Sequence, residues 1–260
     1  MGQPTRQLVI RADDLGMCHA VNEGTLKGIE AGIVTQTSVM TACPWFPEAA
    51  VLVRRTGIPA GIHLTLTCEW DFLRWRPMTD GASLSGGDGT FHRTIEDAQK
   101  NLSHAEAVKE LLAQVRRAFA EGLAISYLDA HMGEAAPDAI SEVSETFGLP
   151  LTVPGHRTSV AFASWSELSP RAGGSKKAWM LEYLRNLTPG LHLLVCHLAV
   201  PGPEIASLTG PDSIPYRWAE EYRKSDLEVV TDPEIRQAIQ DLGIELTSVA
   251  AWQQSGRAQG

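Results

Sequence analysis

Two adjacent carboxylates near the start of the chain are of a type and spacing that suit catalysis. Asp13 and Asp14 follow the apolar residues 8–10 after Arg11 and Ala12, and Gly16 then allows the chain to turn. The mutual repulsion of two neighbouring carboxylates must be relieved by a cation, a shared proton or water. Taken alone, such a pair is at least as typical of the start of a helix as of a catalytic site.

Three histidines lie in comparable positions after apolar segments. His63 interrupts the alternating segment 61–67, His131 follows Asp129 with one residue between them, and His197 ends the run 193–196. A lone histidine in a strand is more often a core residue than a ligand. The D-x-H pair is compatible either with an imidazole that a carboxylate orients or with two direct metal ligands.

The elements that must position these residues alternate between two patterns. We predict strands at residues 7–11, 36–41, 60–65, 125–129, 150–153, 191–196 and 244–249, and helices at 19–31, 47–56, 104–121, 138–147, 176–187 and 232–242. The helix at 104–121, for example, carries an i, i+3, i+4, i+7 apolar stripe behind a Ser103–Glu106 capping box. Strand–helix alternation predicts a parallel α/β sheet, and seven strands favour an incomplete, TIM-like (β/α)7 barrel in a single domain.

Such a barrel gathers the carboxyl ends of its strands at one face, so the acids and imidazoles should converge there. Two imidazoles and a carboxylate are a typical ligand set for a catalytic divalent ion with open positions. Zinc is the first expectation, while magnesium or another divalent ion could occupy the same set. The ion would lower the pKa of a bound water from about 15.7 towards about 7, so a neighbouring carboxylate would suffice as base. A histidine on the far side, His197, could then protonate a departing amine.

Two connections are unusually long for a compact domain. Residues 66–102 carry Trp70, Phe72 and Trp75, and residues 154–175 carry Trp165. Long loops of this kind are commonly lids or binding loops, and aromatic rings match the apolar faces of sugars. We therefore expect both connections to act as lid or substrate loops of a domain that spans residues 1–260.

Composition excludes several classes of partner. The formal net charge of −9 argues against a nucleic-acid partner, because such binding needs a basic face. The four cysteines lack metal-binding spacing and are expected to be unpaired thiols. The apolar run near the N-terminus is too short for a signal segment or a membrane span, so we expect a cytoplasmic protein. The oligomeric state stays open, and a homodimer is compatible with the sequence.

The order of these blocks resembles that of the YdjC-like carbohydrate deacetylases, which are related to the polysaccharide deacetylases. The similar segments are RADDLG at 11–16, GIVTQTS at 32–38, GIHLTLT at 61–67 and DAH at 129–131, and the resemblance spans residues 7–250. It implies a distorted seven-stranded β/α barrel that hydrolyses the N-acetyl group of an amino sugar. By position, the family's metal ligands fall on Asp14, His63 and His131, its base on Asp13 and its acid on His197.

The chain departs from the family pattern at three places. Arg11 stands where the family usually has Asn, and Leu15 where it usually has Phe. The usual His-Pro-Gly near the end reads His197-Leu198-Ala199. The third block is often rich in histidine in the family, but here it reads HMG at 131–133. This leaves His131 as the choice for the third metal ligand.

Other classes of protein share some of these features. A receiver domain also pairs acids after its first strand, but it would explain only half of the chain. A two-carboxylate glycosidase would not use the histidines, and a 2-His-1-carboxylate iron oxygenase usually has an all-β scaffold. A hydrolase of another amide or ester, or a non-catalytic carbohydrate-binding protein, is also compatible. Metal content and acetate release distinguish these alternatives.

Overall fold

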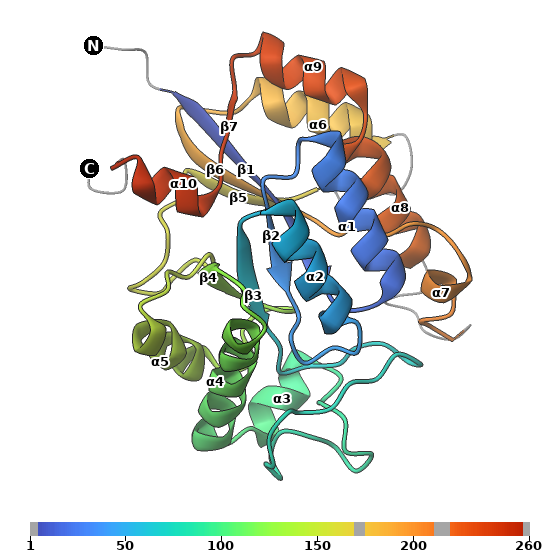
Figure 1. Ribbon diagram of the computed structural model, residues 1–260, viewed down its shortest axis with the longest axis vertical. Helices are drawn as coiled ribbons and strands as arrows, with labels where there is room; N and C mark the ends of the chain where they lie inside the picture. Colours follow the sequence, from blue (N-terminus) through green and yellow to red (C-terminus); the bar gives the residue numbers. More distant parts are fainter. Residues whose placement is uncertain (1–4, 169–174, 211–218, 257–260) are drawn as a thin grey trace.

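The protein folds as a parallel sheet surrounded by helices, in a computed structural model that describes residues 5–168, 175–210 and 219–256 (Figure 1). The elements, in chain order, are β1 (Arg6–Leu15), α1 (His19–Ala31), β2 (Gln36–Val39), α2 (Phe46–Thr56), β3 (Ala60–Leu64), α3 (Ile95–Asn101), α4 (His104–Ala120), β4 (Ile125–Ala130), α5 (Pro137–Phe147), β5 (Ser164–Glu167), α6 (Ser175–Arg185), β6 (Gly190–Cys196), α7 (Pro203–Ala206), α8 (Ala219–Val230), α9 (Pro233–Asp241), β7 (Glu245–Leu246) and α10 (Val249–Gln254).

The sheet is a barrel that does not close. Its strands follow the order β4-β3-β2-β1-β6-β5, β7 pairs with β1, and every pairing is parallel. Strands β4 and β5 are the two ends of this path. The predicted incomplete (β/α)7 barrel in a single domain is confirmed.

Side-chain alternation divides each strand between the barrel interior and the surrounding helices. On β1, Leu8, Ile10 and Ala12 pack in a core cluster with residues of α6, α8 and α9, whereas Val9 packs with interior residues of β4 and β6. Because successive strand residues face opposite ways, Arg11 and Asp13 continue the interior face of Val9. The same rule places the polar ends of the other strands inside the barrel mouth.

Two glycines allow close packing near this mouth. A Cβ at Gly61 of β3 would lie 2.2 Å from the Tyr127 ring, whose hydroxyl donates a hydrogen bond to the Thr37 carbonyl at 2.7 Å. A Cβ at Gly24 of α1 would lie 2.6 Å from the Cα atom of Ala199. Both positions therefore require glycine, and the second one holds α1 against the segment that follows His197.

The structure corrects the predicted fifth strand. Residues 150–153 form no strand and contribute only isolated bridges from Leu151 to Leu128 and Ser159. The fifth strand is β5, inside the connection predicted as the loop 154–175, of which residues 169–174 lie outside the described residues. The sequence could mislead here because 150–153 is more apolar than Ser164–Glu167, an edge strand with half-exposed side chains.

Helices account for the other differences. Helix α3 lies in the predicted loop 66–102, while α7, α8 and α10 were not expected from the sequence. The last predicted strand, 244–249, is shortened to Glu245–Leu246, and α10 begins at Val249. Helix α8 lacks a plain apolar stripe because its buried face includes Arg223 and Asp226.

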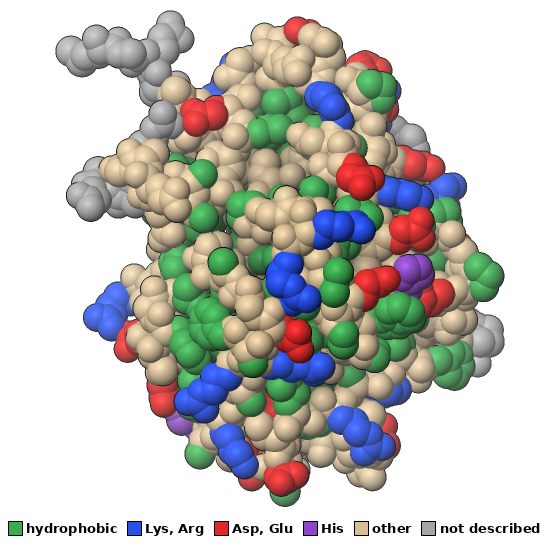
Figure 2. Space-filling view, viewed as in Figure 1, with side chains coloured by type: hydrophobic (Ala, Val, Ile, Leu, Met, Phe, Trp, Pro, Cys, Tyr) green, Lys and Arg blue, Asp and Glu red, His purple; other side chains and the backbone are tan. Residues whose placement is uncertain are grey.

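The exterior is mixed in charge. On the face shown in Figure 2, Lys and Arg side chains are interspersed with Asp and Glu. Within the described residues no helix is both long and apolar enough to cross a membrane. All four cysteines are free thiols, as predicted, and the structure places all of them in buried positions.

Candidate active site

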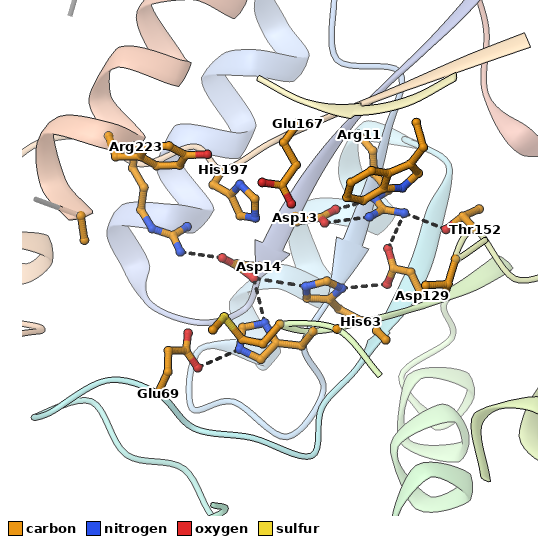
Figure 3. A pocket seen from close by; sticks show the side chains of 18 of the residues that line it. Arg11, Asp13, Asp14, His63, Glu69, Asp129, Thr152, Glu167, His197 and Arg223 are labelled. Atoms are coloured by element: carbon orange, nitrogen blue, oxygen red, sulfur yellow. Dashed lines mark hydrogen bonds and ion pairs between the residues drawn. The ribbon is translucent and has the colours of Figure 1, made fainter. Parts of the chain in front are cut away.

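A cavity of about 550 Å³ opens at the carboxyl ends of the strands (Figure 3). It brings together all five residues that the sequence singled out, namely Asp13, Asp14, His63, His131 and His197. The other polar side chains in its wall come from β1, β4, β5, α8 and the connections: Arg11, Glu69, Asp129, Thr152, Glu167, Tyr222 and Arg223.

Asp14, His63 and His131 form a compact triangle at the base of this cavity. Asp14 Oδ1 lies 3.3 Å from His63 Nε2 and 3.3 Å from His131 Nδ1. All three side chains are buried, and Asp14 Oδ1 has no hydrogen-bond partner among the described residues. A tetrahedral zinc ion with ligand distances of about 2.0–2.1 Å would hold ligand atoms about 3.3 Å apart. The three residues therefore fit a divalent ion.

A local break in β1 turns Asp14 into the cavity. Adjacent residues of a regular strand point to opposite faces, so Asp13 and Asp14 should not both face the barrel interior. The register between β1 and β2 shifts between Ala12 and Leu15, and Asp14 has a φ of 68°. A left-handed conformation is costly for a residue with a Cβ, although Asp tolerates it better than most. The irregularity lets both carboxylates reach one site.

Each imidazole of the triangle has a carboxylate behind it. His63 Nδ1 lies 2.8 Å from Asp129 Oδ1, and His131 Nε2 lies 2.9 Å from Glu69 Oε2. Asp129 is itself fixed by a hydrogen bond of 2.6 Å from the Ser38 hydroxyl. Such carboxylates fix the tautomer and orientation of metal-binding histidines. Asp129 therefore orients His63 on the neighbouring strand and not His131, its neighbour in the D-x-H motif.

These contacts set the charge of the triangle in the absence of an ion. Burial lowers the pKa of both histidines, but the surrounding carboxylates outweigh it; they raise the pKa of His63 well above its usual value and that of His131 to about 9. Burial raises the pKa of Asp14, yet Arg223 and the imidazoles hold that pKa well below its usual range. A divalent ion would replace protons that the imidazoles otherwise carry.

Arg11 joins Asp13 to Asp129. Its guanidinium donates to both oxygens of Asp13, at 2.6 and 2.8 Å, and to Thr152 Oγ1 at 2.7 Å, and lies 2.8 Å from Asp129 Oδ2. Arg11 is buried, and these carboxylates raise its pKa despite its desolvation. The guanidinium neutralises the second possible ligand group, Asp13, His63 and Asp129, which leaves Asp14, His63 and His131 as the candidate metal centre.

Arg223 of α8 supports the other carboxylate. Its Nη2 donates to Asp14 Oδ2 at 2.6 Å, so Asp14 turns one oxygen to the guanidinium and the other to the imidazoles. Sequence reasoning missed the roles of Arg223 and Glu69. For Glu69 the sequence carried one signal, an acid two residues after the GIHLTLT block.

His197 enters the cavity from the other side of the triangle, next to Glu167 and Asp13 (Figure 3). Its backbone N–H donates to Asp226 Oδ2 at 2.8 Å, and Asp226 forms a fully buried ion pair with Lys176. The ring Nδ1 of His197 is buried without a hydrogen-bond partner among the described residues. The loop is thus held by its backbone, and the ring is left to interact with whatever occupies the cavity.

The fold and the site together define a parallel α/β half-barrel with a candidate metal centre at its strand ends. The model of the family described as YdjC-like protein matches residues 7–241, and the chain belongs to that family.

Similar proteins carry names that concern carbohydrates. The carbohydrate deacetylase of Thermus thermophilus is 30% identical, with 90% of this chain and 89% of that protein covered. That of Geobacillus stearothermophilus is 26% identical over 93% and 96%. A crystal structure from Enterococcus faecalis V583, named for cellobiose-phosphate cleavage, has a similar fold, with a TM-score of 0.77 and 21% identity over 94% and 97% of the two chains.

Proposed function

We propose that this protein is a carbohydrate deacetylase that uses a divalent ion to hydrolyse the N-acetyl group of an amino sugar. The observation that carries the proposal is the buried Asp14 Oδ1, which faces two imidazole nitrogens at 3.3 Å at the base of a cavity. Relatives of similar length that are named carbohydrate deacetylases support the choice of reaction.

Asp14, His63 and His131 would hold the ion. Their two nitrogens and one oxygen suit zinc first, with magnesium or another divalent ion as alternatives. When bound, such an ion supplies a polarised acetyl carbonyl and a water of lowered pKa. Glu69 and Asp129 fix the imidazole rings by hydrogen bonds of 2.9 and 2.8 Å, so the ligand atoms need little rearrangement.

Asp13 is the proposed general base. It lines the cavity next to Asp14 but turns both oxygens towards Arg11, so it is oriented without belonging to the triangle. A carboxylate held in this way can accept a proton from water that attacks the acetyl carbon. The Arg11 guanidinium holds this orientation through its two hydrogen bonds to the carboxylate.

His197 is the proposed general acid. An amide nitrogen must be protonated before it leaves, because the amide anion is too basic. His197 lines the same cavity from a different strand. It can therefore donate to nitrogen on the side opposite the ion.

Both long connections are proposed to contact the sugar. Glu69 and Trp70 of 66–102 and Trp165 of 154–175 line the cavity. Trp70 is buried beside Arg223, whereas Trp165 is 40% exposed at the cavity wall. We propose that the chain acts as one deacetylase domain, residues 1–260, with these connections as substrate loops or lids.

The test combines metal analysis with acetate release from a series of N-acetylglucosamine oligosaccharides. Purified protein should carry a divalent ion, release acetate, and lose activity on chelation. Asp13→Asn should keep the ion and lose about 10²–10⁴-fold in turnover, while Asp138→Asn, an exposed acid on α5, serves as the matched control. Full acetate release by metal-free protein would rule out the proposed chemistry.

A further inference from the structure

Glu167 differs from every other acidic side chain of the cavity. Asp13 and Asp129 contact Arg11, Asp14 contacts Arg223, and Glu69 contacts His131. The carboxylate of Glu167 has no hydrogen bond or ion pair with any residue in the described part of the chain. Its charge is therefore left for something that enters the cavity.

The strand geometry explains why Glu167 faces the cavity together with Trp165. Both belong to β5, where Trp165 pairs with Leu193 and Glu167 with Val195 on the interior face of β6. Alternation places both side chains on that face. The opposite face of β5 carries Ser164, whose Oγ lies 2.7 Å from His192 Nδ1 of β6.

Glu167 lies within reach of a bound sugar. Its carboxyl group points towards the space between His197 and Asp13, across the cavity from Glu69 (Figure 3). Strand β5 is an edge of the open barrel and contributes Trp165 and Glu167 to this wall of the cavity. Trp165, with 40% of its surface exposed, adds an aromatic face at the same wall.

The balance of charge makes the cavity negative at this wall. Among the described lining residues there are five carboxylates, Asp13, Asp14, Glu69, Asp129 and Glu167, and two guanidinium groups, Arg11 and Arg223. A divalent ion with neutral imidazole ligands would compensate two more negative charges. The negative charge that remains is that of Glu167, which is also the carboxylate without a partner among the described residues.

We propose that Trp165 and Glu167 form a sugar subsite that accepts neutral or cationic rings and rejects anionic ones. The indole stacks on the C–H face of a pyranose, and the carboxylate accepts hydrogen bonds from hydroxyl or ammonium groups of that ring. A carboxylate or phosphate substituent on the ring would be repelled by Glu167. This inference rests on the proposed function for its substrate class and adds a selectivity that the metal centre does not provide.

The test measures binding, with three disaccharides that lack an acetamido group and so cannot be deacetylated. They are chitobiose with free ammonium groups, neutral cellobiose, and cellobiose with a glucuronic acid at its non-reducing end. Calorimetry on the metal-loaded protein should give affinities in that order, with roughly tenfold between successive ligands, as expected for one charge at a half-exposed site. Glu167→Gln should reduce both differences in affinity between successive ligands to about twofold or less.

Two further variants separate charge from stacking. Trp165→Ala should weaken all three ligands alike, because stacking does not depend on the charge of the substituent. Glu182→Gln, an exposed acid on α6 outside the cavity, should leave the order unchanged. Thermal unfolding of each variant verifies that it is folded.

Two results would overturn the subsite. One is wild-type protein that binds the glucuronate ligand as tightly as cellobiose or binds none of the three. The other is a Glu167→Gln variant that keeps the wild-type order. Failure of the proposed function is a separate outcome, because protein that shows the predicted binding order but releases no acetate would keep the subsite and lose the deacetylase.

Discussion

Removal of the Arg11 guanidinium should destabilise the protein far more than removal of an exposed arginine. The replacement is Arg11→Met, which keeps much of the aliphatic stem and deletes the charge. Arg11 is the hydrogen-bond partner of both Asp13 oxygens, and no other described residue bonds to that carboxylate. Asp129 keeps His63 and Ser38 after the change. One buried carboxylate is therefore left uncompensated.

The expected loss of unfolding free energy follows from this one uncompensated carboxylate. A buried ion pair broken by removal of one partner costs about 3–5 kcal/mol in unfolding free energy. The variant can escape by taking up a proton, which costs about 4 kcal/mol at pH 7 because an ordinary aspartate titrates near pH 3.9. We therefore expect a loss of about 3–4 kcal/mol at pH 7. It should shrink by about 1.4 kcal/mol for each pH unit below 7, since the folded variant then binds a proton that the unfolded chain lacks.

Urea unfolding of the chelated protein, followed by circular dichroism from pH 5 to pH 8, measures this loss without the contribution of a bound ion. The control is Arg157→Met. Arg157 pairs with Glu145 at the surface, where the side chain of Arg157 is 82% exposed, and an exposed pair is worth about 0–1 kcal/mol. A double change of Arg11→Met with Asp13→Asn should restore part of the loss, because no charge is then stranded.

The reasoning would be refuted by a loss at Arg11 no larger than that at Arg157. It would also be refuted if the loss did not vary with pH, because an uncompensated buried carboxylate must couple folding to proton uptake.

Three further predictions concern the candidate centre. The apparent affinity for zinc should rise between about tenfold and 100-fold per pH unit from about pH 6 to pH 8, because the ion must displace protons from His63 and His131. The neighbouring carboxylates raise the pKa of His63 well above its usual value and that of His131 to about 9. Isothermal titration in buffers of different pH would show a flat profile if this is wrong. Asp14→Asn should lose the ion while Asp13→Asn retains it, as measured by metal analysis, and the opposite pattern would mean that the two roles are exchanged. His197→Ala should keep the ion and lose most of its turnover on acetamido sugars but hydrolyse an activated acetate ester almost as fast as wild type, whereas an equal fall in both rates would remove His197 as the acid.

The sequence was sufficient for the sheet and for the convergence of the site because both depend on short-range patterns. Apolar alternation located six of the seven strands, and parallel strands necessarily gather their carboxyl ends. Apolar alternation did not predict β5, where Trp165 and Glu167 face a cavity and give no such pattern. Unlike the other strands that line the site, β5 reads Ser-Trp-Ser-Glu and has no fully buried residue, so no apolar pattern marks it.

The contacts that support the site were less accessible. Asp129 was expected to act with His131, its neighbour in the motif, yet it bonds to His63 because those two residues are register partners on β4 and β3. Glu69 and Arg223 reach the triangle from a long connection and from α8, respectively. Sequence spacing carries no information about such long-range pairs.

The Asp13–Asp14 motif shows how a local irregularity changes the meaning of a sequence pattern. In a regular strand only one of the two carboxylates would face the barrel interior, and the other would be buried against the helices without a partner. The register shift and the left-handed φ of 68° at Asp14 direct both into the cavity, where separate guanidinium groups of Arg11 and Arg223 bind them. Each carboxylate thereby has its own counter-charge and its own orientation. That separation supports the proposed roles, in which Asp14 is a metal ligand and the adjacent, chemically identical Asp13 is the base.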